Sequence, residues 1–176
     1  MILRFLAALV LCSSFTTGIP GQDLISWNPG RLSWDDFKAL PPPNAANAAL
    51  TSSSISLDYS SGSRTFSYSI GCHFNKAQSW GRVKNDLILA HEQGHFDLSE
   101  IYARRLNKAL MQYRYNPSTA NKDVNAIYQA VMQDLQQRQA DYDEQSDHSR
   151  NVPVQKQWLA VISNELAGLE KYADYK

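Results

Sequence analysis

The sequence contains very little cysteine. Cys12 and Cys72 are the only two in 176 residues, whereas a disulfide framework needs an even set of cysteines in the mature chain. The first falls in a segment that we expect to be removed, and the single remaining cysteine, Cys72, cannot form an internal disulfide framework. We interpret Cys72 as a small buried apolar residue rather than a nucleophile. The domain must therefore be stabilised by its hydrophobic core, with or without the help of a metal ion.

The chain also lacks an excess of charge of either sign. Seventeen basic residues balance seventeen acidic ones, and neither sign forms a block. This pattern argues against a nucleic-acid partner and against a polybasic membrane patch. A hydrophobic content of 43% in a chain of this length indicates one ordinary globular domain with a real core.

Long apolar runs are missing as well. The N-terminal run from Phe5 to Leu11 is too short for a membrane span, which takes about 20 apolar residues. It follows a single arginine and precedes small polar residues in "MILRFLAALVLCSSFTTG", which is the order of a secretory signal peptide. We expect residues 1–18 to be the signal peptide and residues 19–176 to be one exported domain, periplasmic or secreted, with no membrane span after signal removal.

Cys12 raises the question of a lipoprotein. The bulky Leu11 stands before it, where lipoprotein processing favours a small residue. We therefore expect cleavage near Thr17 or Gly18 instead of lipid attachment, although the sequence does not settle whether Cys12 is lipidated.

Strand signals precede helix signals along the mature chain. A short strand at 24–27 is followed by a short helix that begins at Ser33, and alternating apolar residues then predict a hairpin of 55–59 with 66–74. Helical periodicity follows, broken near Pro117 and Pro153. Strands first and three helices after them predict an α+β domain.

Two of the four histidines lie four residues apart in "LILAHEQGHFDLSE", residues 87–100. On a helix, His91 and His95 can both direct an imidazole nitrogen at one zinc ion. Glu92 points about 100° further round, too far to be a ligand but able to act as general base on a water at the metal. The alternative is an amphipathic helix that carries the motif by chance, for which about 0.003 matches per chain are expected. We interpret the motif as a zinc site, at which Gly94 would allow close approach of another backbone or of substrate.

A catalytic zinc ion takes a third protein ligand and leaves one position open. If the turn between the first two long helices is centred near residue 119, their antiparallel packing brings about residue 145 to the level of residue 93. The window "ADYDEQSDHS" contains His148, which we favour as the third ligand. Asp143 and Glu165 remain alternatives.

Other polar residues receive different interpretations. His73 lies on a predicted strand, where no packing argument places it near the pair. Asp97 and Glu100 are expected to be helix-surface partners of basic residues near Arg104. The glutamine-rich "QDLQQRQ", residues 133–139, is interpreted as a solvated helix face.

The chain resembles a family of exported bacterial proteins of unknown function that are described as predicted secreted zinc-dependent proteases. The resemblance rests mainly on "SWGRVKNDLILAHEQGHFDLSEIYARRL", with support from "ISWNPGRLSWDDF" and "YDEQSDHS". It implies zinc as cofactor, His91 and His95 as zinc ligands, and Glu92 as the catalytic acid.

A later family motif runs Tyr-Asp, then Thr, one residue, His-Gly. Tyr142, Asp143 and His148 match it here, but Ser146 and Ser149 replace the threonine and the glycine. The serine at 149 leaves the backbone beside His148 less free than a glycine would.

These observations together predict a zincin-like α+β fold, with a small N-terminal antiparallel sheet packed on the active-site helix and two further long helices. The expected function is zinc-dependent hydrolysis of peptide bonds in a peptide or protein substrate, with Tyr142 as the first candidate for stabilising the oxyanion. Two alternatives stay open: a structural zinc that only holds an exported binding domain together, and hydrolysis of cell-wall amides. The sequence specifies neither the substrate nor the oligomeric state.

Overall fold

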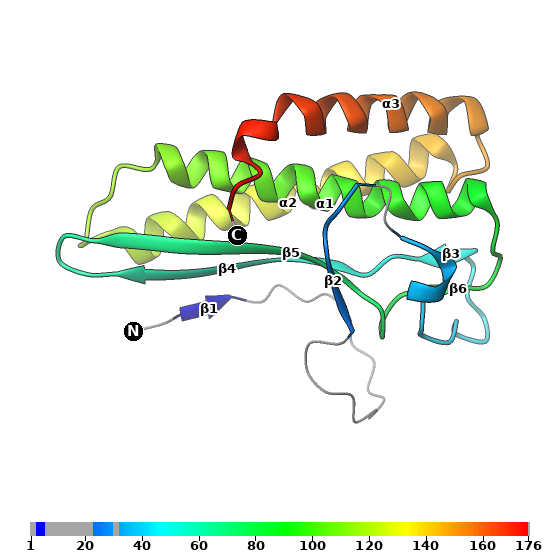
Figure 1. Ribbon diagram of the computed structural model, residues 1–176, viewed down its shortest axis with the longest axis horizontal. Coiled ribbons are helices and arrows are strands. Elements are labelled where there is room, and N and C mark those ends of the chain that lie inside the picture. Colours follow the sequence, from blue (N-terminus) through cyan, green and yellow to red (C-terminus); the bar gives the residue numbers. More distant parts are fainter. Residues whose placement is uncertain (1–2, 6–22, 30–31, 176) are drawn as a thin grey trace.

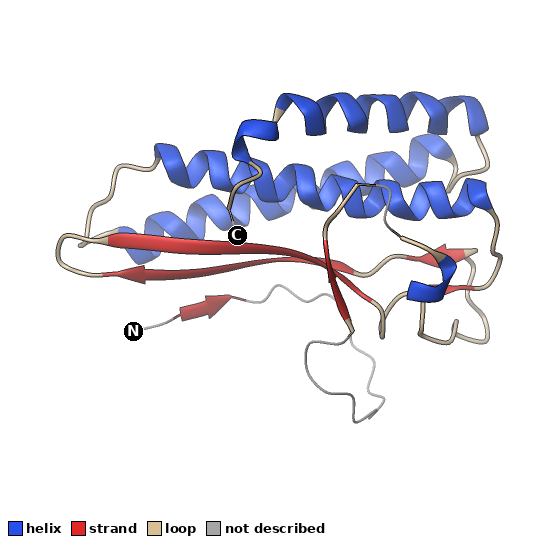
Figure 2. Ribbon diagram, viewed as in Figure 1, coloured by secondary structure: helices blue, strands red, loops and turns tan. Residues whose placement is uncertain are grey.

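The computed structural model describes residues 3–5, 23–29 and 32–175. Strands precede three long helices, which confirms the predicted α+β class and its order (Figures 1 and 2). The elements are β1 (Leu3–Phe5), β2 (Leu24–Ser26), η1 (Trp34–Asp36), β3 (Ala49–Leu50), β4 (Ser53–Ser61), β5 (Phe66–Asn75), β6 (Trp80–Gly81), α1 (Asp86–Gln112), α2 (Ala120–Ser146), α3 (Val152–Gly168) and η2 (Glu170–Tyr172).

The main sheet is antiparallel, with strand order β1-β4-β5-β2, and β3 pairs with β6 in a second, two-stranded sheet. In the β4–β5 hairpin, Ile55 lies opposite Cys72, and Leu57 lies opposite Ile70. All four side chains are buried, because alternation along a strand places them on the same face. The helices lie on that side of the sheet, with α3 farthest from it (Figure 1).

The first strand falls within the predicted signal peptide. β1 pairs with β4, and Leu3 lies opposite Tyr59. The rest of that segment, including the expected cleavage position, lies outside the described residues, so the signal peptide and export remain predictions. None of the helices in the described part of the chain combines the length and the apolar character that a membrane crossing requires.

Two of the three long helices, α1 and α3, begin at residues whose side chains cap them. The side chain of Asn85 accepts a hydrogen bond from the backbone N–H of Ile88, and Asn151 caps α3 in the same way through Val154. Leu98, Ile101, Leu106 and Leu110 of α1 are buried, whereas Leu87, in the first turn, is 36% exposed.

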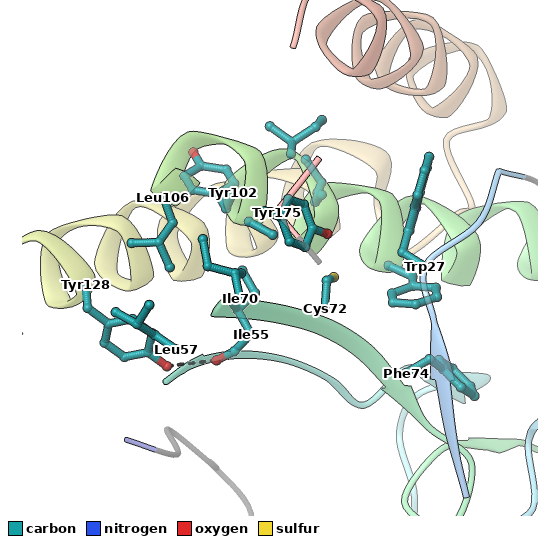
Figure 3. Close-up of a cluster of buried hydrophobic side chains, with 14 of the residues drawn as sticks. Trp27, Ile55, Leu57, Ile70, Cys72, Phe74, Tyr102, Leu106, Tyr128 and Tyr175 are labelled. Carbon is teal, nitrogen blue, oxygen red and sulfur yellow. Dashed lines mark hydrogen bonds between the residues drawn. The ribbon is translucent and has the colours of Figure 1, made fainter. Parts of the chain in front are cut away.

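The core lies between the sheet and the helices (Figure 3). Cys72 is buried there, as predicted, together with Leu106 from α1, Tyr128 from α2 and Tyr175 from the end of the chain. The Tyr128 hydroxyl donates a hydrogen bond to the backbone oxygen of Ile55, 2.9 Å away, and so ties α2 to β4.

Two acidic residues of α1 differ from their predicted roles. Glu100 does pair with Arg104, at 2.9 Å, but both side chains are buried and not on the surface. Asp97 instead accepts hydrogen bonds from the Trp27 indole at 2.8 Å and from Gln93 at 2.7 Å. The segment around β2 covers this side of α1. Asp97, which was predicted to lie on the helix surface, is therefore partly buried, and Glu100 is buried.

Candidate metal centre

The antiparallel packing of α1 and α2 brings the histidine pair opposite Asp143. Asp143 Oδ1 lies 3.0 Å from His91 Nε2 and 3.1 Å from His95 Nε2. The two imidazole nitrogens are 3.2 Å apart. These three residues form a group whose ligand atoms could hold a metal ion.

The dimensions of this group fit tetrahedral zinc. Ligand atoms about 2.0–2.1 Å from a tetrahedral ion lie about 3.3 Å from one another. The three separations in the group, between 3.0 and 3.2 Å, are close to that value. The atoms of His91, His95 and Asp143 therefore form nearly one triangular face of a coordination tetrahedron.

Gln139 determines which nitrogen of His95 faces the group. Its amide Nε2 donates to the backbone oxygen of His95 at 2.9 Å, so its Oε1 is the atom that meets His95 Nδ1 at 2.5 Å. The Nδ1–H must then be the donor, which leaves Nε2 of neutral His95 with a lone pair. A lone pair facing the Asp143 carboxylate is unfavourable unless a cation lies between them, either a proton on Nε2 or a metal ion.

The charge state of the group agrees with this interpretation. Burial opposes the charged form of His95, but the hydrogen bond to Asp143 and the nearby Glu92 carboxylate outweigh it and raise the pKa of His95 above its usual range. For Asp143, burial acts to raise the pKa of the carboxyl. The hydrogen bonds with His91 and His95 outweigh this effect of burial and hold the pKa of Asp143 well below its usual range. The centre therefore keeps an anionic ligand and favours a cation.

We expect Gln139→Leu to weaken zinc binding about 10- to 100-fold, because a residue that orients a metal-bound histidine has an effect of this size. Gln139→Glu keeps an acceptor for the Nδ1–H and should lose much less. Zinc affinity measured by competition with a chelating dye gives the comparison.

Gln137→Leu is the matched control, since Gln137 lies on the same helix but is exposed. Equal affinities for Gln139→Leu and Gln137→Leu would show that Gln139 does not orient His95.

The prediction of a solvated face for residues 133–139 is wrong at Gln139. Its position four residues before Asp143, on the same face of α2, was the signal that could have identified it.

Glu92 lies next to the group but is not one of its three members. Its side chain is 4% exposed and lines the cavity at the centre. Its Oε2 is buried without a hydrogen-bond partner among the described residues, and so is Nδ1 of His91. A buried carboxylate oxygen without a partner carries a cost, which a bound water or substrate would remove.

His148 lies at the edge of the centre. Its Nδ1 is 3.3 Å from Asp143 Oδ1, and its side chain is about half exposed. It is not part of the three-residue group, so its role as a ligand stays a prediction. α2 ends at Ser146, and His148 therefore lies beyond the helix, whereas Asp143 is still within it.

The turn that carries His148 has an unfavourable backbone. Asp147, His148 and Ser149 all have positive φ, of 49°, 49° and 75°. The left-handed region costs a non-glycine residue roughly 1–2 kcal/mol. Ser149 occupies the position at which the resembled family has glycine.

Ser149→Gly should accordingly stabilise the protein by about 0.5–1 kcal/mol, since glycine adopts this φ without strain but loses more entropy on folding. Thermal unfolding should show a melting temperature higher by about 1–4 °C. Ser149→Ala keeps the strain and should give no increase. If alanine stabilises as much as glycine, the positive φ is not the cause.

Tyr142 packs behind the histidine pair. Its ring stacks on His91, with ring centroids 4.5 Å apart, and its hydroxyl donates to the backbone oxygen of His91 at 3.4 Å. It is fully buried and does not line the cavity, so the expectation that it stabilises an oxyanion is wrong. Burial also raises the pKa of its hydroxyl far above the usual range.

The same ring explains Gly94. A Cβ atom at this position would lie 2.5 Å from the Tyr142 hydroxyl oxygen, which is too close for any side chain. The group that approaches Gly94 is therefore Tyr142 and not a substrate.

The remaining candidates lie elsewhere. Glu165 forms ion pairs with Arg105 at 2.7 Å and with Arg138 at 2.8 Å, and it does not line the cavity. His73 is on β5, opposite Ser54 of β4, and is also absent from the cavity lining. Neither can complete the group in this arrangement.

The centre opens into a cavity of about 500 Å³. Its lining includes the whole three-residue group, Glu92 and His148, as well as residues 47–55. Thr51 fixes that segment to α1, because its hydroxyl donates to the backbone oxygen of Glu92 at 3.2 Å. A ligand in the cavity can therefore reach the group and the Glu92 carboxylate together.

Comparisons with known proteins point to the same part of the chain. Neither the curated proteins nor the solved structures gave a significant match. A family model does match residues 71–149, which include the second half of β5, β6, α1 and α2. The part of the chain that contains His91, Glu92, His95, Asp143 and His148 is thus similar to a family described as bacterial proteins of unknown function (DUF922).

Proposed function

We propose that this protein is an exported zinc-dependent hydrolase that cleaves peptide bonds. The observation that carries the proposal is the combination of a tetrahedral face of ligand atoms with a buried, unpartnered Glu92 oxygen beside it. The resemblance to predicted secreted zinc proteases supports the same activity. The signal-peptide pattern supports a periplasmic or secreted location.

His91, His95 and Asp143 would hold the ion in this proposal. Zinc, when bound, would polarise the scissile carbonyl and lower the pKa of a water. Asp143 is preferred to His148 as the third ligand because its Oδ1 is within 3.1 Å of both imidazole nitrogens. His148 would then orient the Asp143 carboxylate from 3.3 Å away, in the way that outer residues commonly support metal ligands.

Glu92 would carry the proton. Its carboxylate takes a proton from the attacking water and returns it to the leaving amine. The buried position keeps the carboxylate next to the reacting atoms, and the Thr51 hydrogen bond to the Glu92 backbone fixes its distance from the opposite wall. Tyr142 contributes by holding the His91 ring in place, through the stacking described above.

A structural zinc site is the principal alternative. Such sites are usually closed by four protein ligands, whereas catalytic sites have three and an open position. The group identified here has three members and faces a cavity, which favours the catalytic interpretation.

The direct test uses the purified domain, residues 19–176, with and without zinc. We expect close to one zinc per chain and cleavage of a denatured protein substrate, detected by mass spectrometry. Removal of zinc by a chelator should abolish cleavage, and added zinc should restore it. A fully zinc-loaded protein that cleaves no member of a broad peptide library would support the structural role instead.

A further inference from the structure

The cavity at the metal centre continues along α2 as a groove. It is lined by one face of α1 from Ile88 to Ser99, by the segment 47–55 and by the face of α2 from Met132 to Asp143. The groove therefore extends beyond the ligand atoms of His91, His95 and Asp143.

The chemistry of the groove changes along its length. Histidine and carboxylate side chains surround the metal centre, whereas Ile55, Met132 and Leu135 line the distant end together with the uncharged Ser53, Ser54 and Gln136. Glu92 and Asp143 are the only charged residues in the described lining, apart from the histidines, and no lysine or arginine is present. Ile55 also accepts the Tyr128 hydrogen bond that joins α2 to β4 (Figure 3).

The apolar end lies at a defined distance from the metal centre. Leu135 precedes Asp143 by just over two helical turns, which corresponds to a rise of about 12 Å. An extended chain covers about 3.3–3.6 Å per residue. A peptide that follows the groove therefore places its third or fourth residue from the cleaved bond beside Leu135.

We infer that the groove selects extended peptides with an apolar side chain, of leucine or methionine size, three or four residues from the cleaved bond. This inference rests on the proposed function of the metal centre. A charged side chain at this position would lose its water without gaining an ionic partner. An apolar side chain would instead be buried against Ile55, Met132 and Leu135.

The test measures binding of metal-chelating peptides to the zinc-loaded protein, so that it does not depend on turnover. Two series of tetrapeptide hydroxamates carry the chelating group at either end of the chain. Each series has leucine or aspartate at the third or the fourth residue from that group and alanine elsewhere. Calorimetry should show the best leucine ligand binding at least about tenfold more tightly than its aspartate counterpart, which is a usual degree of discrimination for an apolar pocket.

Leu135→Lys locates the effect within the groove. It should reverse the preference, so that the aspartate ligand binds more tightly, while Val161→Lys should change nothing. Val161 is 43% exposed on α3 and does not line the groove. Met132→Lys provides a second variant with a shift in the same direction, should Leu135→Lys fail to fold.

The binding data distinguish a failure of the groove inference from a failure of the proposed function. If acetohydroxamate binds the zinc but the leucine and aspartate ligands have equal affinity, the groove inference is overturned and the proposed function stands. Unchanged preference in both lysine variants also overturns the inference. If not even acetohydroxamate binds to the zinc-loaded protein, the metal has no open position, and the inference fails together with the proposed function.

Discussion

Glu92→Gln should retain zinc and lose activity. Glutamine keeps the size of the side chain but removes the basic carboxylate, and Glu92 is not part of the ligand group. We therefore expect a zinc content and a melting temperature near those of the wild type, with hydrolysis reduced by about 10²–10⁴-fold, the usual contribution of a positioned general base. Zinc analysis and peptide-cleavage rates on the same preparation provide the two measurements.

Each contrary result has a separate meaning. A Gln variant that cleaves as fast as the wild type would show that Glu92 is not the base. A Gln variant that loses its zinc would make Glu92 a ligand or a structural residue, and the proposed mechanism would fail with it. Gln93→Ala, next along α1 but with its side chain hydrogen-bonded to Asp97 on another side, serves as the control for a change in this helix.

Removal of the central ligands should have the largest effect on zinc binding and on stability. His95→Ala and Asp143→Ala each delete one corner of the ligand triangle, and we expect zinc affinity to fall by more than about 100-fold, beyond the range of an outer residue. Zinc at about 1,000 times its dissociation constant stabilises the folded chain by about 4 kcal/mol. For a domain of this size, that corresponds to a melting temperature about 10 °C higher, which these variants should not show.

His148→Ala and His73→Ala complete this experiment. If His148 acts through Asp143, as its position 3.3 Å from Oδ1 indicates, its removal should reduce zinc affinity about 10- to 100-fold, and His73→Ala should have no effect. A loss from His148→Ala as large as that from His95→Ala, with zinc retained by Asp143→Ala, would restore His148 as the third ligand. A wild-type protein that takes up no zinc would refute the metal centre itself.

The sequence by itself determined the features that depend on residues close together in the chain. The alternating residues of β4 and β5, the cap at Ser33 and the helical periodicity gave the order of elements, because each reports a local backbone preference or a face that must be buried. The spacing of His91 and His95 was sufficient to place both imidazoles on one side of α1, and Glu92 beside them. These parts of the site required no knowledge of the tertiary structure.

The tertiary structure decided which residues meet the histidine pair. His91 lies opposite Asp143, and His95 lies opposite Gln139, so α2 is shifted by about one turn from the alignment expected for a turn centred at residue 119. The side chains packed between the helices, including Tyr142 against Gly94, fix this alignment, and no local pattern encodes it. A shift of one turn is sufficient to bring Asp143 into the group and to convert Gln139 from a surface residue into the partner of His95, while the end of α2 at Ser146 leaves His148 beyond the helix.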